Sequence, residues 1–172
     1  EVLLVSGPTA LTPPAGVELC PVTTAEEMRK AVISRFSWSD TVIMAAAVAD
    51  FRPTQPAAQK LKKRRSPVTS LELSPTDDIL RELGERRTTQ VLVGFAAETE
   101  DLLAHAREKL QAKGVDLLVA NDVTAAGSGF GSDTNRVFIL DRDGRAEELP
   151  LLPKREVADR ILDRVLTLPT GR

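Results

Sequence analysis

The 172 residues suffice for one domain with a substantial core, and 42% hydrophobic with 28% charged residues is typical of a globular protein. A formal net charge of -2 excludes a global positive field for nucleic acid, so any anion binding must be local. A single cysteine, Cys20, excludes an internal disulfide, and no apolar run approaches the ~20 residues of a membrane span. We therefore expect a cytoplasmic protein. Because the chain begins without methionine in a strand-like run, we also expect it to be a segment of a longer polypeptide.

The first part of the chain predicts three strands and one helix. Thr24 followed by Glu27 three residues later forms a capping box, which marks the beginning of a helix. A loop with cationic residues is predicted over 51–67. Short apolar runs predict the strands, which are Val2–Ser6, Val17–Val22 and Val42–Val48.

The second part of the chain continues the alternation. Apolar residues at helical spacing predict helices over Asp77–Leu83, Asp101–Lys113 and Lys154–Leu166. Strands are predicted over Val68–Leu73, Gln90–Phe95, Val115–Ala120, Val137–Leu140 and Glu147–Leu151. The turn Asp141–Gly144 joins the last two strands as a hairpin. The pattern predicts an α/β fold with a doubly wound, mostly parallel sheet, helices on both faces and a C-terminal antiparallel edge hairpin. No repeat or linker divides the chain, so we predict one domain over 1–172.

The segment from Thr41 to Arg65 carries the most information about function. Its apolar strand ends near a carboxylate, Asp50, after several alanines that leave the backbone accessible to a ligand. Ligands of α/β sheets bind at the carboxyl ends of the strands. Asp50 is therefore either a ligand-orienting acid or simply the cap of a loop. Five cations follow within six positions, Lys60, Lys62, Lys63, Arg64 and Arg65. They indicate a solvated face, a nuclear-targeting or nucleic-acid segment, or an anion site.

Three further patterns bear on a ligand site. Gly94–Glu98 repeats the combination of a strand end, small residues and an acid, so it could line the same cleft as Asp50. Lys109 and Lys113 share one helix face, where they either complement the negative helix end or bind a polyanion. The glycines at 127, 129 and 131 precede a strand instead of a helix. The dinucleotide fingerprint therefore fails, a flexible lid is the better interpretation, and an NAD(P)-dependent oxidoreductase is disfavoured.

Several motifs occur in an order that resembles a known family. SGPTAL, TAEEM, AAAVADFRP, KLKK, GFAAET, KLxxKxxDLLVAND and GFGSD extend over nearly the whole chain. In this order they are similar to those of the phosphopantothenoylcysteine synthetases, which in bacteria usually form the C-terminal domain of a bifunctional coenzyme A biosynthesis protein. The family's domain begins earlier, with a strand and a segment like SNxSSGxMG. Its asparagine is linked to acyl activation, so we expect this chain to hold the nucleotide half of the site.

The resemblance implies a Rossmann-like fold and a CTP-dependent ligase. CTP would activate the carboxylate of 4'-phosphopantothenate as an acyl-cytidylate, with magnesium and release of pyrophosphate. The amino group of L-cysteine would then attack to give phosphopantothenoylcysteine and CMP. The resemblance also implies a homodimer without nucleic-acid or membrane partners, and FMN only on an upstream decarboxylase domain. The alternative is a CTP-binding or dimerisation module without catalysis.

The resemblance also implies the site residues. Lys60, at the head of a flap over about 51–67, carries the catalytic role and binds nucleotide. Thr76 and Asp77 replace the asparagine and proline of the family's NPDI motif, which leaves backbone contacts there. No metal ligand is assigned. The remaining nucleotide-binding positions are Met44, Ala45, Ala46, Asp50, Thr76, Asp77, Asp78, Ile79, Phe95, Lys109 and Lys113.

Overall fold

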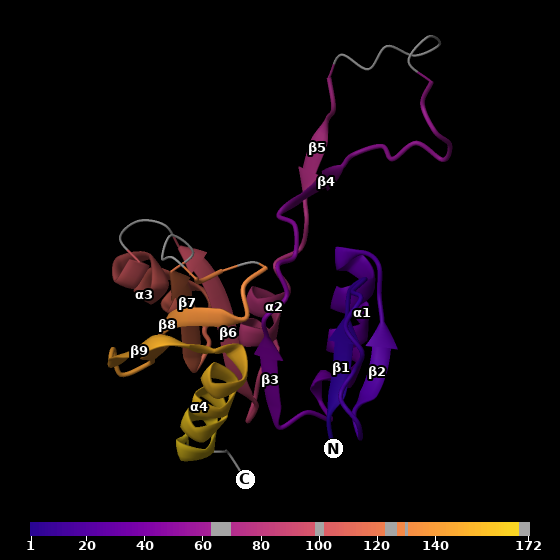
Figure 1. The fold of residues 1–172 in the computed structure, drawn as a ribbon. Helices are drawn as coiled ribbons and strands as arrows, with labels where there is room; N and C mark the ends of the chain where they lie inside the picture. The colour runs from indigo at the N-terminus through magenta and orange to yellow at the C-terminus, as the bar shows by residue number, and fades with distance from the viewer. Residues whose placement is uncertain (63–69, 99–101, 123–126, 130, 169–172) are drawn as a thin grey trace. The chain divides into compact units, whose positions relative to one another are not determined.

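The computed structural model describes all residues except 63–69, 99–101, 123–126, 130 and 169–172 (Figure 1). The chain divides into two compact units, and each unit is built from two separate stretches of sequence. Unit 1 contains residues 1–32 and 47–78, and unit 2 contains residues 33–46 and 79–172. The prediction of one domain over the whole chain stays a prediction, and the two units are described separately below.

Unit 1 begins with two short strands and the first turns of a helix. β1 (Leu3–Ser6) pairs in parallel with β2 (Glu18–Pro21). α1 (Ala25–Phe36) follows, and its residues up to 32 belong to this unit. The predicted capping box is confirmed, because the Glu27 N–H donates to Thr24 Oγ1 at 3.1 Å while Glu27 Oε2 accepts from the Thr24 N–H at 3.2 Å.

The rest of unit 1 contains a two-stranded antiparallel arm. β4 (Phe51–Pro53) pairs with β5 (Leu73–Pro75), and we call these strands and the described residues between them the arm. The prediction of a loop starting at residue 51 was wrong for the first three residues. The strand predicted over 68–73 begins only at Leu73, and residues 68 and 69 lie outside the described part. Hydrogen bonds from a distant segment decide both boundaries, for example from the Thr54 N–H to the Glu72 carbonyl at 3.0 Å.

Unit 2 is built on a five-stranded sheet with the order β3-β6-β7-β8-β9. β3-β6 and β6-β7 pair in parallel, while β7-β8 and β8-β9 pair antiparallel. The strands are β3 (Thr41–Met44), β6 (Val91–Glu98), β7 (Leu117–Asp122), β8 (Thr134–Asp141) and β9 (Ala146–Pro153). The predicted α/β fold with a C-terminal antiparallel edge is confirmed. β3 ends at Met44 instead of residue 48, because the alanines that follow form no ladder with β6.

Helices cover both faces of this sheet, as predicted. The helices are α2 (Ile79–Arg86), α3 (Leu102–Lys113) and α4 (Lys154–Thr167). On one face, Val157, Ile161 and Val165 of α4 are buried in a cluster with β-branched and leucine residues of β6 to β9. On the other face, a Cβ at Gly94 would lie 2.6 Å from Leu80 Cδ2 of α2, so glycine allows α2 to pack directly on β6. Successive side chains along each strand point to opposite faces of the sheet, so both faces contribute buried residues.

Candidate functional site

Four predicted positions lie at or near the end of β3 in unit 2. Met44, the last residue of β3, pairs with Gly94, and Phe95 is the next residue of β6. Met44 is half-buried, whereas Ala45 and Ala46 are exposed and follow without regular structure. Phe95 packs against the apolar cluster under α4. The end of β3 therefore lies beside Gly94, but β6 continues to Glu98 because β7 pairs with it beyond the end of β3, so the prediction that a strand ends at Phe95 was wrong.

The lysine pair lies on the helix that connects β6 to β7. Lys109 is exposed and Lys113, the last residue of α3, is half-buried. A Cβ on Gly84 would overlap the Lys113 carbonyl oxygen, so the end of α3 lies against α2. Since α3 runs antiparallel to β6 and β7, Lys113 lies toward the amino end of β7, whereas Met44 lies at the carboxyl end of β3. The topology of unit 2 thus directs Lys113 away from the β3 strand end, and its nucleotide-binding role stays a prediction.

The segment after β5 is anchored to the base of the arm in unit 1. The Thr76 N–H donates to the Asp50 carbonyl at 2.8 Å, and the Thr76 hydroxyl donates to the Ala49 carbonyl at 2.5 Å. Asp77 Oδ2 lies 3.6 Å from Nε of Arg29 on α1. The side chains of Thr76 and Asp77 therefore both make specific contacts within unit 1. Asp50 and Thr76 come together through the backbone, while the Asp50 side chain is exposed.

The other predicted positions differ in burial. Asp78 is exposed, whereas Ile79 is buried with 3% exposure at the beginning of α2, so its side chain serves the core. Lys60 and Lys62 are exposed in the arm. Lys63, Arg64 and Arg65 lie outside the described residues. The glycines at 127, 129 and 131 have φ of 79°, 97° and 76°, a region that favours glycine. Their interpretation as a lid stays a prediction.

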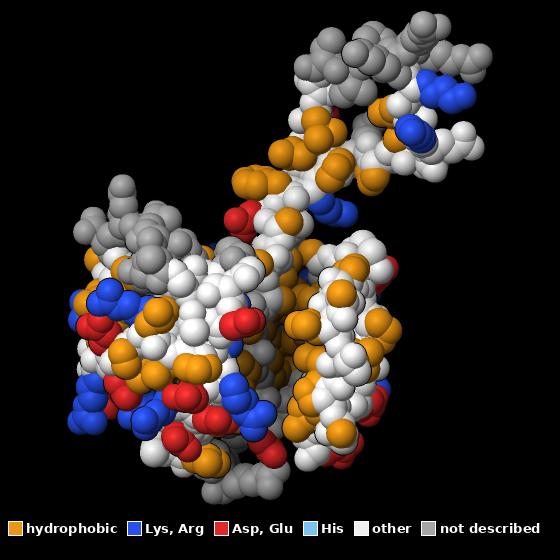
Figure 2. Space-filling view, viewed as in Figure 1, with side chains coloured by type: hydrophobic (Ala, Val, Ile, Leu, Met, Phe, Trp, Pro, Cys, Tyr) orange, Lys and Arg blue, Asp and Glu red, His pale blue; other side chains and the backbone are white. Residues whose placement is uncertain are grey.

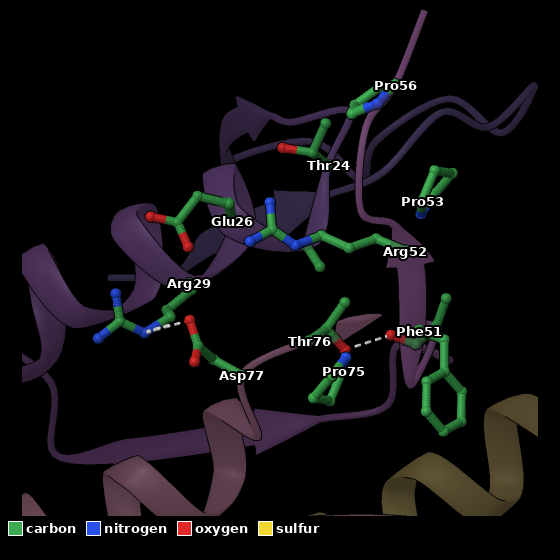
Figure 3. A pocket seen from close by; sticks show the side chains of 12 residues that line it. Thr24, Glu26, Arg29, Phe51, Arg52, Pro53, Pro56, Pro75, Thr76 and Asp77 are labelled. Atoms are coloured by element: carbon green, nitrogen blue, oxygen red, sulfur yellow. Dashed lines mark hydrogen bonds and ion pairs between the residues drawn. The ribbon is translucent and has the colours of Figure 1, made fainter. Parts of the chain in front are cut away.

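A cavity of about 410 Å³ opens in unit 1 beside the arm (Figure 3). It lies between the beginning of α1, the first residues of the arm and the segment that carries Thr76 and Asp77. Three prolines form an apolar part of its wall, and Arg29 and Arg52 contribute cations. A pocket of this volume that combines apolar and polar groups is typical of a small-molecule site. Neither arginine was predicted as a site residue, although Arg52 stands in the AAAVADFRP motif only two residues after Asp50.

Electrostatic interactions near the cavity are dominated by local pairs. The backbone N–H groups of Thr23, at 2.7 Å, and of Thr24 donate to the Glu27 carboxylate and lower the pKa of Glu27 below its usual value. Glu26, which lines the cavity, has its carboxylate 3.2 Å from Nζ of Lys30. Within the described residues, no group of three or more His, Cys, Asp or Glu side chains could hold a metal ion. Magnesium that binds together with a nucleotide needs only one or two carboxylates, so a single acid such as Asp50 is compatible with it.

Comparisons with known proteins show that this chain is similar to coenzyme A biosynthesis proteins. A family model described as "DNA/pantothenate metabolism flavoprotein C-terminal domain" matches residues 1–168. The Bacillus subtilis coenzyme A biosynthesis bifunctional protein CoaBC is 51% identical over 169 residues, which cover 98% of this chain and 41% of that protein. A crystal structure of the C-terminal domain of a CoaBC protein superposes with a TM-score of 0.79 at 42% identity, covering 96% of this chain and 72% of that one.

One similar protein carries a different name. A cysteine/cysteine sulfinic acid decarboxylase from an unknown prokaryotic organism is 41% identical over 170 residues, covering 98% of this chain and 47% of that protein. This chain therefore spans less than half of either curated relative. Among the described residues, none of the helices has the length and apolar character needed to cross a membrane.

Proposed function

The chain belongs to the DNA/pantothenate metabolism flavoprotein C-terminal domain family, and on that premise we propose that it forms the ligase part of a coenzyme A biosynthesis enzyme. The observation that carries the proposal is the 51% identity with a CoaBC protein over 98% of the chain. The proposed reaction joins 4'-phosphopantothenate to L-cysteine at the expense of CTP. FMN is assigned to a decarboxylase in the part of the relatives that this chain does not span.

The proposed chemistry has two steps. A carboxylate oxygen of 4'-phosphopantothenate attacks the α-phosphorus of CTP, the bond to the β-phosphate breaks, and pyrophosphate leaves. The amino nitrogen of cysteine then attacks the acyl carbon of the cytidylate, loses a proton and expels CMP. Activation is necessary because an oxide ion is a very poor leaving group, whereas CMP is a good one.

Cationic side chains suit the first step. Attack of a carboxylate on a triphosphate brings two anions together, and positive groups that are already in place stabilise the charge of such a transition state. Lys60 is proposed to supply this charge from the flap, and Lys109 and Lys113 to bind nucleotide. Asp50 would orient the nucleotide or its magnesium ion, and magnesium would supply further positive charge for the phosphates. Closure of the flap would exclude water, which otherwise hydrolyses the acyl-cytidylate.

Because the second relative is named as a decarboxylase, the test of the proposed function needs a control for decarboxylation. Both relatives extend well beyond this chain, so the name of the whole protein can describe a part that this chain lacks. Because the chain spans only 41% of the CoaBC relative, a second candidate is a module that binds CTP without ligating. For both candidate functions, we propose that the protein is a homodimer in the cytoplasm.

One assay separates these candidates. The chain, and the complete polypeptide that contains it, are incubated with CTP, magnesium and 4'-phosphopantothenate, with and without L-cysteine. A ligase releases pyrophosphate and then forms CMP and phosphopantothenoylcysteine only when cysteine is present. Release of carbon dioxide from cysteine is measured in parallel as the control for decarboxylation. CTP binding by calorimetry without pyrophosphate release supports the second candidate, and absence of both contradicts the proposed function.

A further inference from the structure

The cavity of unit 1 contains one cation without a partner in the described part of the chain. Among the described residues, no hydrogen bond or ion pair joins the Arg52 guanidinium to another group, whereas Arg29 lies 3.6 Å from Asp77. The carboxylate of Glu26 is likewise paired, with Lys30. The remaining polar residues on the wall, Thr24 and Thr76, are neutral. One positive charge therefore remains uncompensated in the cavity.

The geometry of β4 directs this charge into the cavity. Successive side chains of a strand point to opposite sides. In Figure 3 the side chain of Arg52 extends from β4 toward the beginning of α1, while the ring of Phe51 points the other way. Just before α1, the N–H groups of Thr23 and Thr24 already donate to the Glu27 carboxylate, so these two donors are occupied. Arg52 is thus the group that an anionic ligand in this cavity would meet.

We propose that Arg52 binds a phosphate group of a phosphorylated substrate in this cavity. A guanidinium donates two parallel hydrogen bonds to phosphate, and the apolar wall beside it favours a ligand with an uncharged body. Thr76 and Asp77 belong to the same wall, so the ligand would contact the segment that is aligned with the nucleotide motif. Both CTP and 4'-phosphopantothenate offer this chemistry. The inference rests on the proposed function for the identity of these ligands.

Calorimetry with the whole chain tests the inference. CTP and 4'-phosphopantothenate are titrated separately into the wild type, Arg52→Gln, Arg52→Lys and Arg155→Gln. Arg155 is the matched control, because it is an exposed arginine on α4 whose partner is Asp159. Arg52→Gln should lower the affinity for one of the two ligands about tenfold, which is the loss expected for a charged hydrogen bond. Arg52→Lys should recover part of the affinity, and Arg155→Gln should change neither.

The outcomes decide both the source of the phosphate and the inference itself. The ligand that Arg52→Gln weakens is the one whose phosphate occupies the cavity. Unchanged affinity for both ligands, or no binding of either ligand to the wild type, overturns the inference. Equal loss in Arg155→Gln would show a general charge effect and would overturn it too. Failure of the proposed function can be told apart from failure of this inference. In that case no pyrophosphate is released, while the affinity that depends on Arg52 persists. Circular dichroism of each variant verifies that the exposed substitution leaves the fold intact.

Discussion

Thr76 and Asp77 hold the segment after β5 in place through their side chains. The hydroxyl of Thr76 donates to the Ala49 carbonyl, and the carboxylate of Asp77 lies beside Arg29. Both contacts connect the segment after β5 to parts of unit 1 that are distant in sequence. The ion pair is exposed on the Asp77 side, so its contribution to stability is small, about 0–1 kcal/mol. Its role is geometric, because it links α1 to the segment that carries Thr76 and Asp77 on the wall of the cavity.

Lys60 is the residue on which the proposed catalysis depends most. Lys60→Gln should lower the turnover of pyrophosphate release about 100-fold, because it removes a charge that offsets anion–anion repulsion in the transition state. The rate is measured in the complete polypeptide at saturating CTP. Lys62→Gln is the matched control, since it removes the same charge two residues away and should have a much smaller effect. Equal rates for wild type and Lys60→Gln would contradict the catalytic role.

Glu27 gives the molecule a defined response to acid. Its folded-state pKa is lowered by the Thr23 and Thr24 N–H groups, so its stabilising effect is present above the ordinary value of 4.5 and is lost as pH falls through the lowered value. Glu27→Gln should therefore have a lower urea midpoint than the wild type at about pH 7, and the difference should shrink below pH 4.5. Glu72→Gln, a change at an exposed acid of the arm, is the control. A constant difference across this range would refute the capping role.

At the scale of elements, the sequence predicted the types of most helices and strands correctly. Several of the predicted boundaries were wrong. Periodicity identified α3, α4 and the hairpin β8-β9, since each has a continuous apolar pattern. It did not identify β4, whose three residues are all exposed. It also assigned the alanines after Met44 to a strand, because an apolar run does not report whether a partner strand continues beside it.

The contact between α2 and α3 provides a test at this scale. Gly84→Ala adds a Cβ that overlaps the Lys113 carbonyl oxygen, and a backbone group cannot rotate away. We expect a loss of about 1–3 kcal/mol in the free energy of unfolding, in spite of the better helix propensity of alanine. Urea denaturation measures it. Gly7→Ala, where no atom lies within 4 Å of the added Cβ, is the control. An unchanged or higher midpoint for Gly84→Ala would contradict the close packing.

At the scale of the whole molecule, charge and apolar surface point to different kinds of partner. The net charge of -2 disfavours nucleic acid as a general partner. The arm, in contrast, exposes Phe51, Leu61, Leu71 and Leu73, and Figure 2 shows apolar side chains along it. Exposed apolar surface of this kind often marks an interface between proteins.

The predicted homodimer can be tested directly. Sedimentation equilibrium of the wild type should give twice the mass of the chain, and the apolar arm is the first place to examine. Leu73→Asp should shift the equilibrium toward the monomer, because it places a charge on an exposed apolar strand. Leu166→Asp, at an apolar residue of α4 that is 83% exposed, is the matched control. A wild type that sediments as a monomer at all concentrations would contradict the homodimer.

The sequence by itself determined the succession of α/β elements, the capping box of α1 and the order of motifs that predicts the family. These features depend on residues that are close to one another in the sequence, so they can be recognised from a single sequence. Only the tertiary structure decided that β4 pairs with β5 and that Arg29, Arg52 and Asp77 line one cavity. Such contacts join residues that lie 20 or more positions apart, and they form through hydrogen bonds and packing that no local pattern encodes.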